Sequence, residues 1–208
     1  MSDYVRDGAE IYRRSFATIR AESDLEGLDP VLERVVVRMI HACGMVDLTA
    51  DIAASPGFGA AGEAALRGGA PIICDTNMVA SGVTRSRLSG GSEVVCTLTD
   101  PSVPELAAQL GTTRTAAAME LWRERLGGSV VVVGNAPTAL FRLLELVEQG
   151  VESPAVVIGV PVGFIGAAES KLALAEHPAG LEHVVVHGRR GGSAIAAAAV
   201  NALASEAE

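Results

Sequence analysis

Short runs of β-branched residues alternate with helical stretches along much of the chain. From about residue 70 onward these runs are almost continuously apolar, as strands buried on both faces must be. Residues with turn chemistry follow the runs, and helical patterns lie between most of them. The runs are APIICD (70–75), SEVVCTL (92–98), SVVVVGN (129–135), PAVVIGV (154–160) and EHVVVHG (182–188).

The helical segments predict how such a sheet is covered. Three follow strands: TAAAMELWRERL, TALFRLLELVEQG and GGSAIAAAAVNALASEAE. Two more, DGAEIYRRSFATIRAES and PVLERVVVRMIHACG, predict N-terminal helices that pack beside the sheet. Strands that alternate with helices indicate a parallel sheet with helices on both faces. We therefore predict an α/β fold, a three-layer α/β/α arrangement with a mostly parallel sheet plus N-terminal helices. We expect residues 1–208 to form one domain.

Ligands of such sheets bind beyond the carboxyl ends of the strands. The segments at those ends are CDTNM, GNAPT, GVPVGF and HGRRGGS. They contain amide, hydroxyl and arginine side chains, which suit an anionic ligand. Neither a GxxxxGK[ST] loop nor a GxGxxG turn after a strand is present, so the sequence disfavours nucleotide binding.

Composition and charge narrow the class of protein. Apolar residues make up 49% of the chain and charged residues 20%, which is enough for a sizeable core. The net charge of −9 argues against nucleic-acid and anionic-membrane partners. The apolar runs are far shorter than the roughly 20 residues of a membrane span. The three cysteines form no CxxC pair, and the N-terminal segment lacks a signal-peptide core, so we expect a cytoplasmic protein with free thiols.

The segment RMIHACG ends a predicted helix over residues 30–43. Pro30 suits the first turn of a helix. Arg34, Arg38 and His41 stand four and three residues apart, so they share a stripe that is distinct from the apolar one. His41 therefore need not point into the core. The apolar stripe consists of Leu32, Val35, Val36, Met39 and Cys43.

Several roles are open to His41 from the residues alone. Imidazole changes charge near neutral pH and can donate a proton, so His41 is a candidate acid. It could equally be a structural histidine in the core or at the helix end. A metal site is disfavoured because His177, His183 and His187 show no ligand spacing with carboxylates or thiols, and we predict none.

Polar side chains near helix starts and strand ends are candidates for anion binding. In GNAPTALF, Thr138 is expected to cap the following helix, and the free backbone N–H groups at the helix start could donate to a carboxylate or phosphate. Gly191, Gly192 and Ser193 precede a helix and could form an anion nest. Arginine binds carboxylates in a bidentate fork, so a ligand with several carboxylates would suit this set. The candidates are Thr84, Arg85, Arg114, Asn135, Thr138, Lys171, Gly192 and Ser193.

Seven segments in one order resemble the precorrin-8X methylmutase family of cobalamin biosynthesis. They are RSF (14–16), RMIHACG (38–44), CDTNMVASGVTR (74–85), TRTAAA (113–118), GNAPTALF (134–141), GVPVGFIGAAESK (159–171) and GRRGGSAIAAAAVNAL (188–203). The resemblance extends over almost the whole chain, and several long segments together are far more specific than any single glycine turn.

The resemblance implies an isomerase that moves a methyl group from C11 to C12 of precorrin-8X and yields hydrogenobyrinate. It implies no redox cofactor or nucleotide. His41 matches the family's proton donor or acceptor, and Ser15 and Arg38 match positions that contact substrate. The resemblance also implies an α/β homodimer whose partner subunit helps to shape the pocket.

Three other functions compete with this one. The chain could be a non-catalytic carrier that binds a corrinoid and passes it on. It could act on a cobalt-containing substrate, although HACG after RMI favours the metal-free one. A hydrolase or acyltransferase that uses Cys43 with His41 is disfavoured, because residues two apart on a helix point in different directions.

Overall fold

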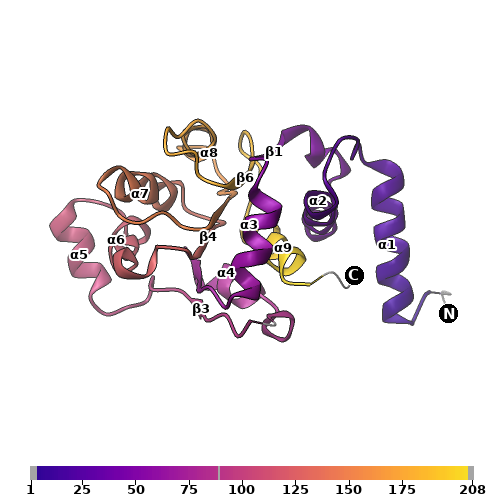
Figure 1. The fold of residues 1–208 in the computed structure, drawn as a ribbon, viewed down its shortest axis with the longest axis horizontal. Coiled ribbons are helices and arrows are strands. Elements are labelled where there is room, and N and C mark those ends of the chain that lie inside the picture. Colours follow the sequence, from indigo (N-terminus) through magenta and orange to yellow (C-terminus); the bar gives the residue numbers. More distant parts are fainter. Residues whose placement is uncertain (1–3, 89, 206–208) are drawn as a thin grey trace.

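The computed structural model describes residues 4–88 and 90–205. Within these ranges, six strands form one sheet in the order β1-β6-β5-β4-β2-β3. Neighbours run parallel except at one edge, where β1 is antiparallel to β6. Figure 1 shows the strands standing between two groups of helices. The strands are β1 (Ile52–Ala54), β2 (Ile72–Cys74), β3 (Val94–Val95), β4 (Val130–Val133), β5 (Val156–Gly159) and β6 (His183–Val186).

The central strand β4 shows why both faces of the sheet need covering. Its four valines are all buried. Val130 and Val132 belong to one apolar cluster, whereas Val131 and Val133 belong to another. Successive side chains of a strand point to opposite faces, so a continuous apolar run indicates two covered faces. The predicted three-layer α/β/α fold with a mostly parallel sheet is confirmed.

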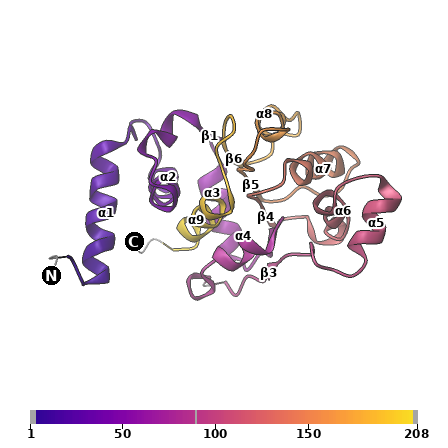
Figure 2. The ribbon, with the colours of Figure 1, turned by 180° about the vertical axis from the view of Figure 1, so that it is seen from behind.

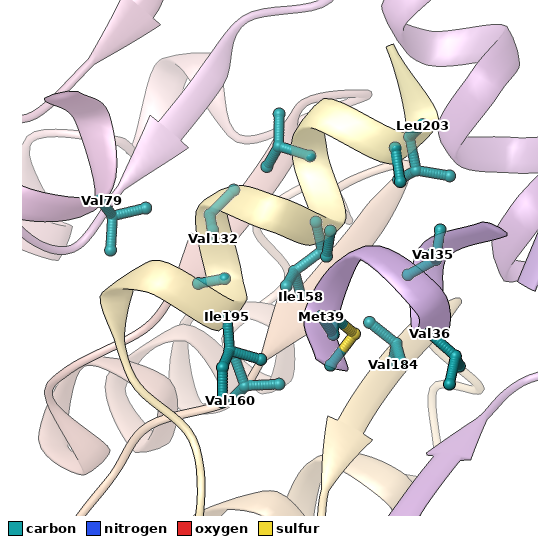
Figure 3. Close-up of a cluster of buried hydrophobic side chains, with 14 of the residues drawn as sticks. Val35, Val36, Met39, Val79, Val132, Ile158, Val160, Val184, Ile195 and Leu203 are labelled. Carbon is teal, nitrogen blue, oxygen red and sulfur yellow. The ribbon is translucent and has the colours of Figure 1, made fainter. Parts of the chain in front are cut away.

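One layer contains the helices that matter most for the site. It is made of α2 (Pro30–Cys43), α3 (Phe58–Arg67), α4 (Asn77–Gly82) and α9 (Ser193–Leu203). α2 packs along α9, and α1 (Gly8–Glu22) packs on α2. Figure 3 shows Met39 of α2 in one cluster with Ile158 and Val184 of the sheet. The predicted N-terminal helices are thus confirmed, with α2 in the layer and α1 packed on it.

The second layer covers the opposite face. Its helices are α5 (Val103–Leu110), α6 (Arg114–Glu120), α7 (Pro137–Glu148) and α8 (Ala167–Ala175), and Figure 2 shows them from behind. Short 3₁₀ helices are η1 (Val46–Asp51), η2 (Arg85–Arg87) and η3 (Arg123–Arg125). No helix among the described residues is long and apolar enough to cross a membrane.

Besides the helices α4, α5 and α8, which were not named from the sequence, three details differ from the sequence-based expectations. β1 and α3 lie between residues 44 and 69, where we predicted no element. β1 has only three residues, too few to show a pattern, and it relies on pairing with β6. The helix predicted over TAAAMELWRERL ends at Glu120. Beyond it the chain turns so that Trp122 is buried, with its indole N–H donating to the Thr97 hydroxyl at 2.6 Å.

The third difference concerns Thr138, which does not cap α7. The helix begins at Pro137, and its N-cap residue is Ala136, which has no capping side chain. Thr138 therefore lies inside the first turn, where its hydroxyl is free for other partners. The last predicted helix is confirmed as α9, although residues 206–208 of its predicted extent lie outside the described residues.

Candidate active site

The carboxyl ends of β2, β4, β5 and β6 lie along one edge of the sheet, called here the carboxyl edge. The chain passes from these ends into α4, α7, α8 and α9 respectively. Each of these helices therefore begins at the same edge, with its unpaired backbone N–H groups there. This is the part of a parallel sheet where ligands bind.

His41 lies in the last turn of α2, beside that edge. Its imidazole is exposed, so the core position is excluded. The ring lies against two aromatic rings of α1, with centroids 5.0 Å from Phe16 and 5.4 Å from Tyr12. The helix ends at Cys43, and the capping residue Gly44 takes the left-handed conformation with φ 71°. That conformation suits glycine, so the chain turns away directly after His41 and leaves its ring open to a ligand.

Arg38 stands one turn before His41 and is 9% exposed. Its guanidinium lies over the Phe16 ring, 5.4 Å from the centroid. Arg34, which shares the stripe, is held elsewhere: it donates to the Ala202 carbonyl at 3.0 Å and pairs with Glu63. Arg38 is therefore the cation of this stripe that accompanies His41 in lining a cavity.

Three adjoining cavities form a groove between α1 and the layer of α2, α4 and α9. One of about 380 Å³ is lined by Ser15 and His41, and another of about 280 Å³ by His41 and Arg38. A third, of about 490 Å³, is lined by Tyr12 and two arginines. The 380 Å³ and 280 Å³ cavities share His41, and the 280 Å³ and 490 Å³ cavities share Tyr12. These two side chains therefore separate neighbouring parts of one groove. The structure thus brings Ser15, Arg38 and His41 together.

Thr84 and Arg85 follow α4 at the edge of this groove. The backbone N–H of Thr84 donates to the side-chain oxygen of Asn201 at 2.8 Å, and the Asn201 amide donates to the Gly82 carbonyl at 3.0 Å. Asn201 thereby fixes the end of α4 on α9 and also lines the 280 Å³ cavity. Thr84 and Arg85 are both exposed there.

A second group of predicted residues lies over the other layer. The hydroxyl of Thr138 is 2.8 Å from that of Thr113 and 3.1 Å from that of Thr115. These contacts bring the starts of α6 and α7 together. Arg114 and Asn135 are exposed near these helix starts. Thr113, Arg114, Thr115, Asn135 and Thr138 are called the threonine cluster below.

Lys171, a predicted anion-binding residue, points inward. Its side chain is fully buried in α8, and its ammonium donates to the Arg190 carbonyl at 2.7 Å. Burial lowers the pKa of Lys171 to about 8. Arg190 in turn pairs with Asp47 at 2.8 Å and Asp51 at 3.4 Å. Within one chain, Lys171 supports the loop before α9 instead of reaching outward.

That loop carries the predicted anion nest. Gly191 and Gly192 have φ angles of 153° and 125°, which favour glycine, and the Gly192 N–H donates to the Val160 carbonyl at 2.9 Å. Ser193 begins α9 and is 9% exposed. At least one N–H group of the predicted nest is therefore already hydrogen-bonded to the loop after β5.

Two further residues, Asp75 at the carboxyl edge and Asn201 in the groove, were not singled out from the sequence. Asp75 is 2% exposed and accepts three backbone N–H groups of the turn after β4. Burial raises the pKa of its carboxyl group, and these hydrogen bonds offset part of the rise. Asn201 interrupts an alanine-rich helix. Two sequence signals could have identified them: Asp75 is an acidic residue directly after a buried strand, and Asn201 is an amide residue in an apolar run.

No group of three or more histidine, cysteine or acidic side chains within residues 4–88 and 90–205 is arranged to hold a metal ion. Cys43, Cys74 and Cys96 are free thiols. Burial raises the pKa of the Cys43 thiol, which makes it a weaker nucleophile at neutral pH. This disfavours the hydrolase that would use Cys43.

Comparison with known protein families agrees with the geometry. The family described as precorrin-8X methylmutase matches residues 10–206. The chain belongs to the precorrin-8X methylmutase family. The match includes the groove residues Ser15, Arg38 and His41 and nearly all of the fold described above.

Individual proteins are similar to this chain over all or nearly all of their length. The precorrin-8X methylmutase of Pseudomonas aeruginosa is 62% identical over all of both chains. That of a Sinorhizobium species is 58% identical over 97% of this chain and 96% of its own. The cobalt-precorrin-8 methylmutase of Salmonella typhimurium is 39% identical over 96% of each. A solved precorrin-8X methylmutase from Thermus thermophilus superposes with a TM-score of 0.86, at 40% identity and 95% coverage of both chains.

Proposed function

We propose that this chain is a precorrin-8X methylmutase, an isomerase that moves the methyl group on C11 of precorrin-8X to C12 to give hydrogenobyrinate. The observation that carries the proposal is the groove where His41, Ser15 and Arg38 meet, in a chain of this family. The reaction rearranges one molecule without gain or loss of atoms or electrons. It therefore calls for no redox cofactor or nucleotide.

His41 acts as the acid. The methyl shift is a 1,5-sigmatropic migration along a conjugated system. Protonation of a ring nitrogen, or hydrogen bonding to it, draws electron density away from the migrating centre and stabilises the charge-shifted transition state. The proton returns to His41 once the methyl group has moved. Tyr12 and Phe16 hold the imidazole on one side, so its orientation is set before the substrate arrives.

Arg38 and the polar residues of the groove and the carboxyl edge bind the peripheral carboxylates of the macrocycle. Arg38 and Ser15 line the cavities at His41, and Thr84 and Arg85 stand at the end of α4. Gly192 and Ser193 start α9, and Lys171 holds the loop before it. This set binds through several separate contacts, which fixes the ring against His41. Residues 1–208 would act as one domain in the cytoplasm, without nucleic-acid or membrane partners.

We further propose that the active enzyme is a homodimer. The predicted binding residues fall into two groups, the His41 groove over one layer and the threonine cluster over the other. Phe164 and Ile165, which precede α8, are 80% and 89% exposed. Exposed apolar groups of this size favour a covered interface. A second copy would cover them and present its threonine cluster to the groove of the first.

Mixing two inactive variants tests the shared site. His41→Ala and Arg114→Ala homodimers should each be impaired, whereas subunits exchanged between them should recover about a quarter of wild-type activity. Half of the randomly mixed dimers contain both variants, and one of their two sites is intact. Recovery of no activity, with subunit exchange verified by mass, would show that each site uses residues of a single chain.

The absorption spectrum of the macrocycle tests the reaction itself. We expect wild-type protein to convert precorrin-8X to hydrogenobyrinate, and His41→Ala to bind the macrocycle but convert it about 10²–10⁴-fold more slowly. His177→Ala is the matched control, because His177 lies after α8 and lines none of the three groove cavities described above. Equal turnover by wild type and His41→Ala would remove the acid role.

Two alternatives are decided by the same assay. The chain is 62% and 58% identical to two enzymes named precorrin-8X methylmutase, but 39% identical to one named cobalt-precorrin-8 methylmutase. This difference favours the metal-free substrate. Parallel time courses with precorrin-8X and cobalt-precorrin-8 should show faster conversion of the first. A corrinoid carrier would bind hydrogenobyrinate tightly and convert neither substrate.

A further inference from the structure

One buried carboxylate organises the turn that follows β4. Asp75 comes directly after β2, and its side chain accepts the backbone N–H groups of Gly134 at 3.1 Å, Asn135 at 2.9 Å and Ala136 at 2.8 Å. The backbone N–H of Asp75 donates to the Val132 carbonyl at 3.0 Å, which extends the ladder between β2 and β4. Strand pairing thus aims the carboxylate at the turn of the neighbouring strand.

The three amides of this turn have few other ways to be satisfied. They follow the last residue of β4 and precede α7, so neither the sheet nor the helix offers them a complete set of acceptors. Buried backbone N–H groups without partners cost about 1–3 kcal/mol each, which explains why a charged acceptor is kept inside the protein. Two carboxylate oxygens satisfy three donors.

The turn carries several parts of the carboxyl edge at once. A Cβ atom on Gly134 would lie 2.8 Å from both Val79 of α4 and Ala196 of α9, so the turn is packed closely against these two helices. Asn135, the next residue, is exposed at the edge. Pro137 then starts α7, whose first turn presents Thr138 to the threonine cluster. A shift of the turn would therefore move Asn135 and Thr138 together.

We propose that Asp75 is a positioning residue for macrocycle binding, acting through the Gly134–Ala136 turn to hold Asn135 and the start of α7 toward the ligand. The inference rests on the proposed function, since Asn135 and Thr138 bind a peripheral carboxylate only if the macrocycle is the ligand. Asp75 itself does not touch the ligand, because it is 2% exposed. Its effect appears in affinity and not in the chemical step.

Asp75→Asn is the informative substitution. The amide keeps the volume, and its oxygen can still accept from Asn135 and Ala136, whereas its NH₂ group meets the Gly134 N–H donor to donor. We expect the dissociation constant for hydrogenobyrinate, from an absorbance titration, to rise at least about tenfold. KM for precorrin-8X should rise in parallel, while kcat at saturation stays within about threefold of wild type.

Ser129→Ala is the matched control. Ser129 is fully buried and donates to the Leu126 carbonyl at 2.6 Å, but it precedes β4 at the opposite edge of the sheet. It should lower the melting temperature without changing the dissociation constant. If Asp75→Asn and Ser129→Ala lower stability alike and both bind hydrogenobyrinate like wild type, Asp75 is only a structural residue.

Asn135→Ala tests the same inference without disturbing the carboxylate, because the backbone N–H to Asp75 remains. It should weaken hydrogenobyrinate binding by a factor similar to that of Asp75→Asn, and the double variant should be little worse than either. Wild-type affinity in Asn135→Ala would overturn the inference, whatever the folding of the Asp75 variants. Wild-type protein that neither binds nor converts the macrocycle would instead overturn the proposed function.

Discussion

The His41 groove and the β4–α7 turn are held by different forces. At the groove, side chains of α1 pack against the end of α2, and the His41 ring rests on Phe16 and Tyr12. At the turn, three backbone amides converge on the buried Asp75 carboxylate. Packing is non-directional and tolerates small shifts, whereas hydrogen bonds to a charge fix the backbone closely.

The two regions therefore serve different roles. The reacting group, the His41 imidazole, lies at the end of α2. Phe16 and Tyr12 leave one side of its ring open, so the imidazole can contact a large substrate. The groups proposed to bind carboxylates stand on turns and helix starts that the sheet holds rigidly. The variants below test whether packing governs the first region and backbone geometry the second. The first three run from the largest to the smallest expected change in the free energy of unfolding, and a pH dependence of stability follows them.

Phe16→Ala should destabilise the protein by about 3–5 kcal/mol, as removal of a buried phenylalanine usually does. Phe16 is 1% exposed, and its ring also contacts His41. Urea unfolding followed by circular dichroism measures the loss. Phe58→Ala is the control, because Phe58 of α3 is equally buried in the same apolar cluster but lines none of the three groove cavities. Only Phe16→Ala should also lower kcat. If kcat falls to a similar extent in both variants, the contact between Phe16 and His41 does not matter for catalysis.

Gly134→Ala should cost about 1–3 kcal/mol through overpacking. The new methyl group would lie 2.8 Å from Val79 and Ala196 and would push the turn away from α4 and α9. The expected consequence is weaker binding of hydrogenobyrinate, measured by titration at a temperature where the variant is folded. Gly8→Ala is the control, since nothing lies within 4 Å of that position. If Gly134→Ala binds hydrogenobyrinate with wild-type affinity, the turn can shift without weakening ligand binding.

Tyr12→Ala should change the free energy of unfolding by no more than about 0.5 kcal/mol, because Tyr12 is 48% exposed. It removes one of the two rings beside His41, so kcat should fall by about tenfold as the imidazole loses its orientation. Tyr4→Ala, at an even more exposed tyrosine, should leave both quantities unchanged. A Tyr12 variant with wild-type kcat would show that Phe16 alone suffices to orient His41.

Lys171 contributes a pH dependence of stability. Its pKa is about 8 in the folded protein, below the ordinary value of 10.5. Between these values the unfolded chain binds more protons, so this group makes stability rise with pH from about 8 to 10.5. Lys171→Met should show a smaller rise than wild type when unfolding is measured across that range. Identical slopes would place the Lys171 ammonium in contact with water.

Sequence patterns predicted much of this architecture for a clear reason. Continuous valine runs such as Val130–Val133 are stable only where both faces are covered, so they indicated a parallel sheet without reference to any other part of the chain. The N-terminal helix α2 was also predicted from local signals, since Pro30 and Gly44 mark its start and end. Elements that depend on a distant partner were missed, as β1 shows: its three residues form a strand only because β6 lies beside them.

The residues themselves, therefore, determined the layers of the fold, the place of His41 near a helix end and, through the resemblance, the family. Tertiary structure decided which polar groups meet. Asp75 and the turn at Gly134 are about sixty residues apart, and Lys171 is buried beneath the loop of Arg190 instead of facing a ligand. Local periodicity reports which face of an element is buried, but a hydrogen bond between distant segments depends on strand order and register, which no short pattern contains.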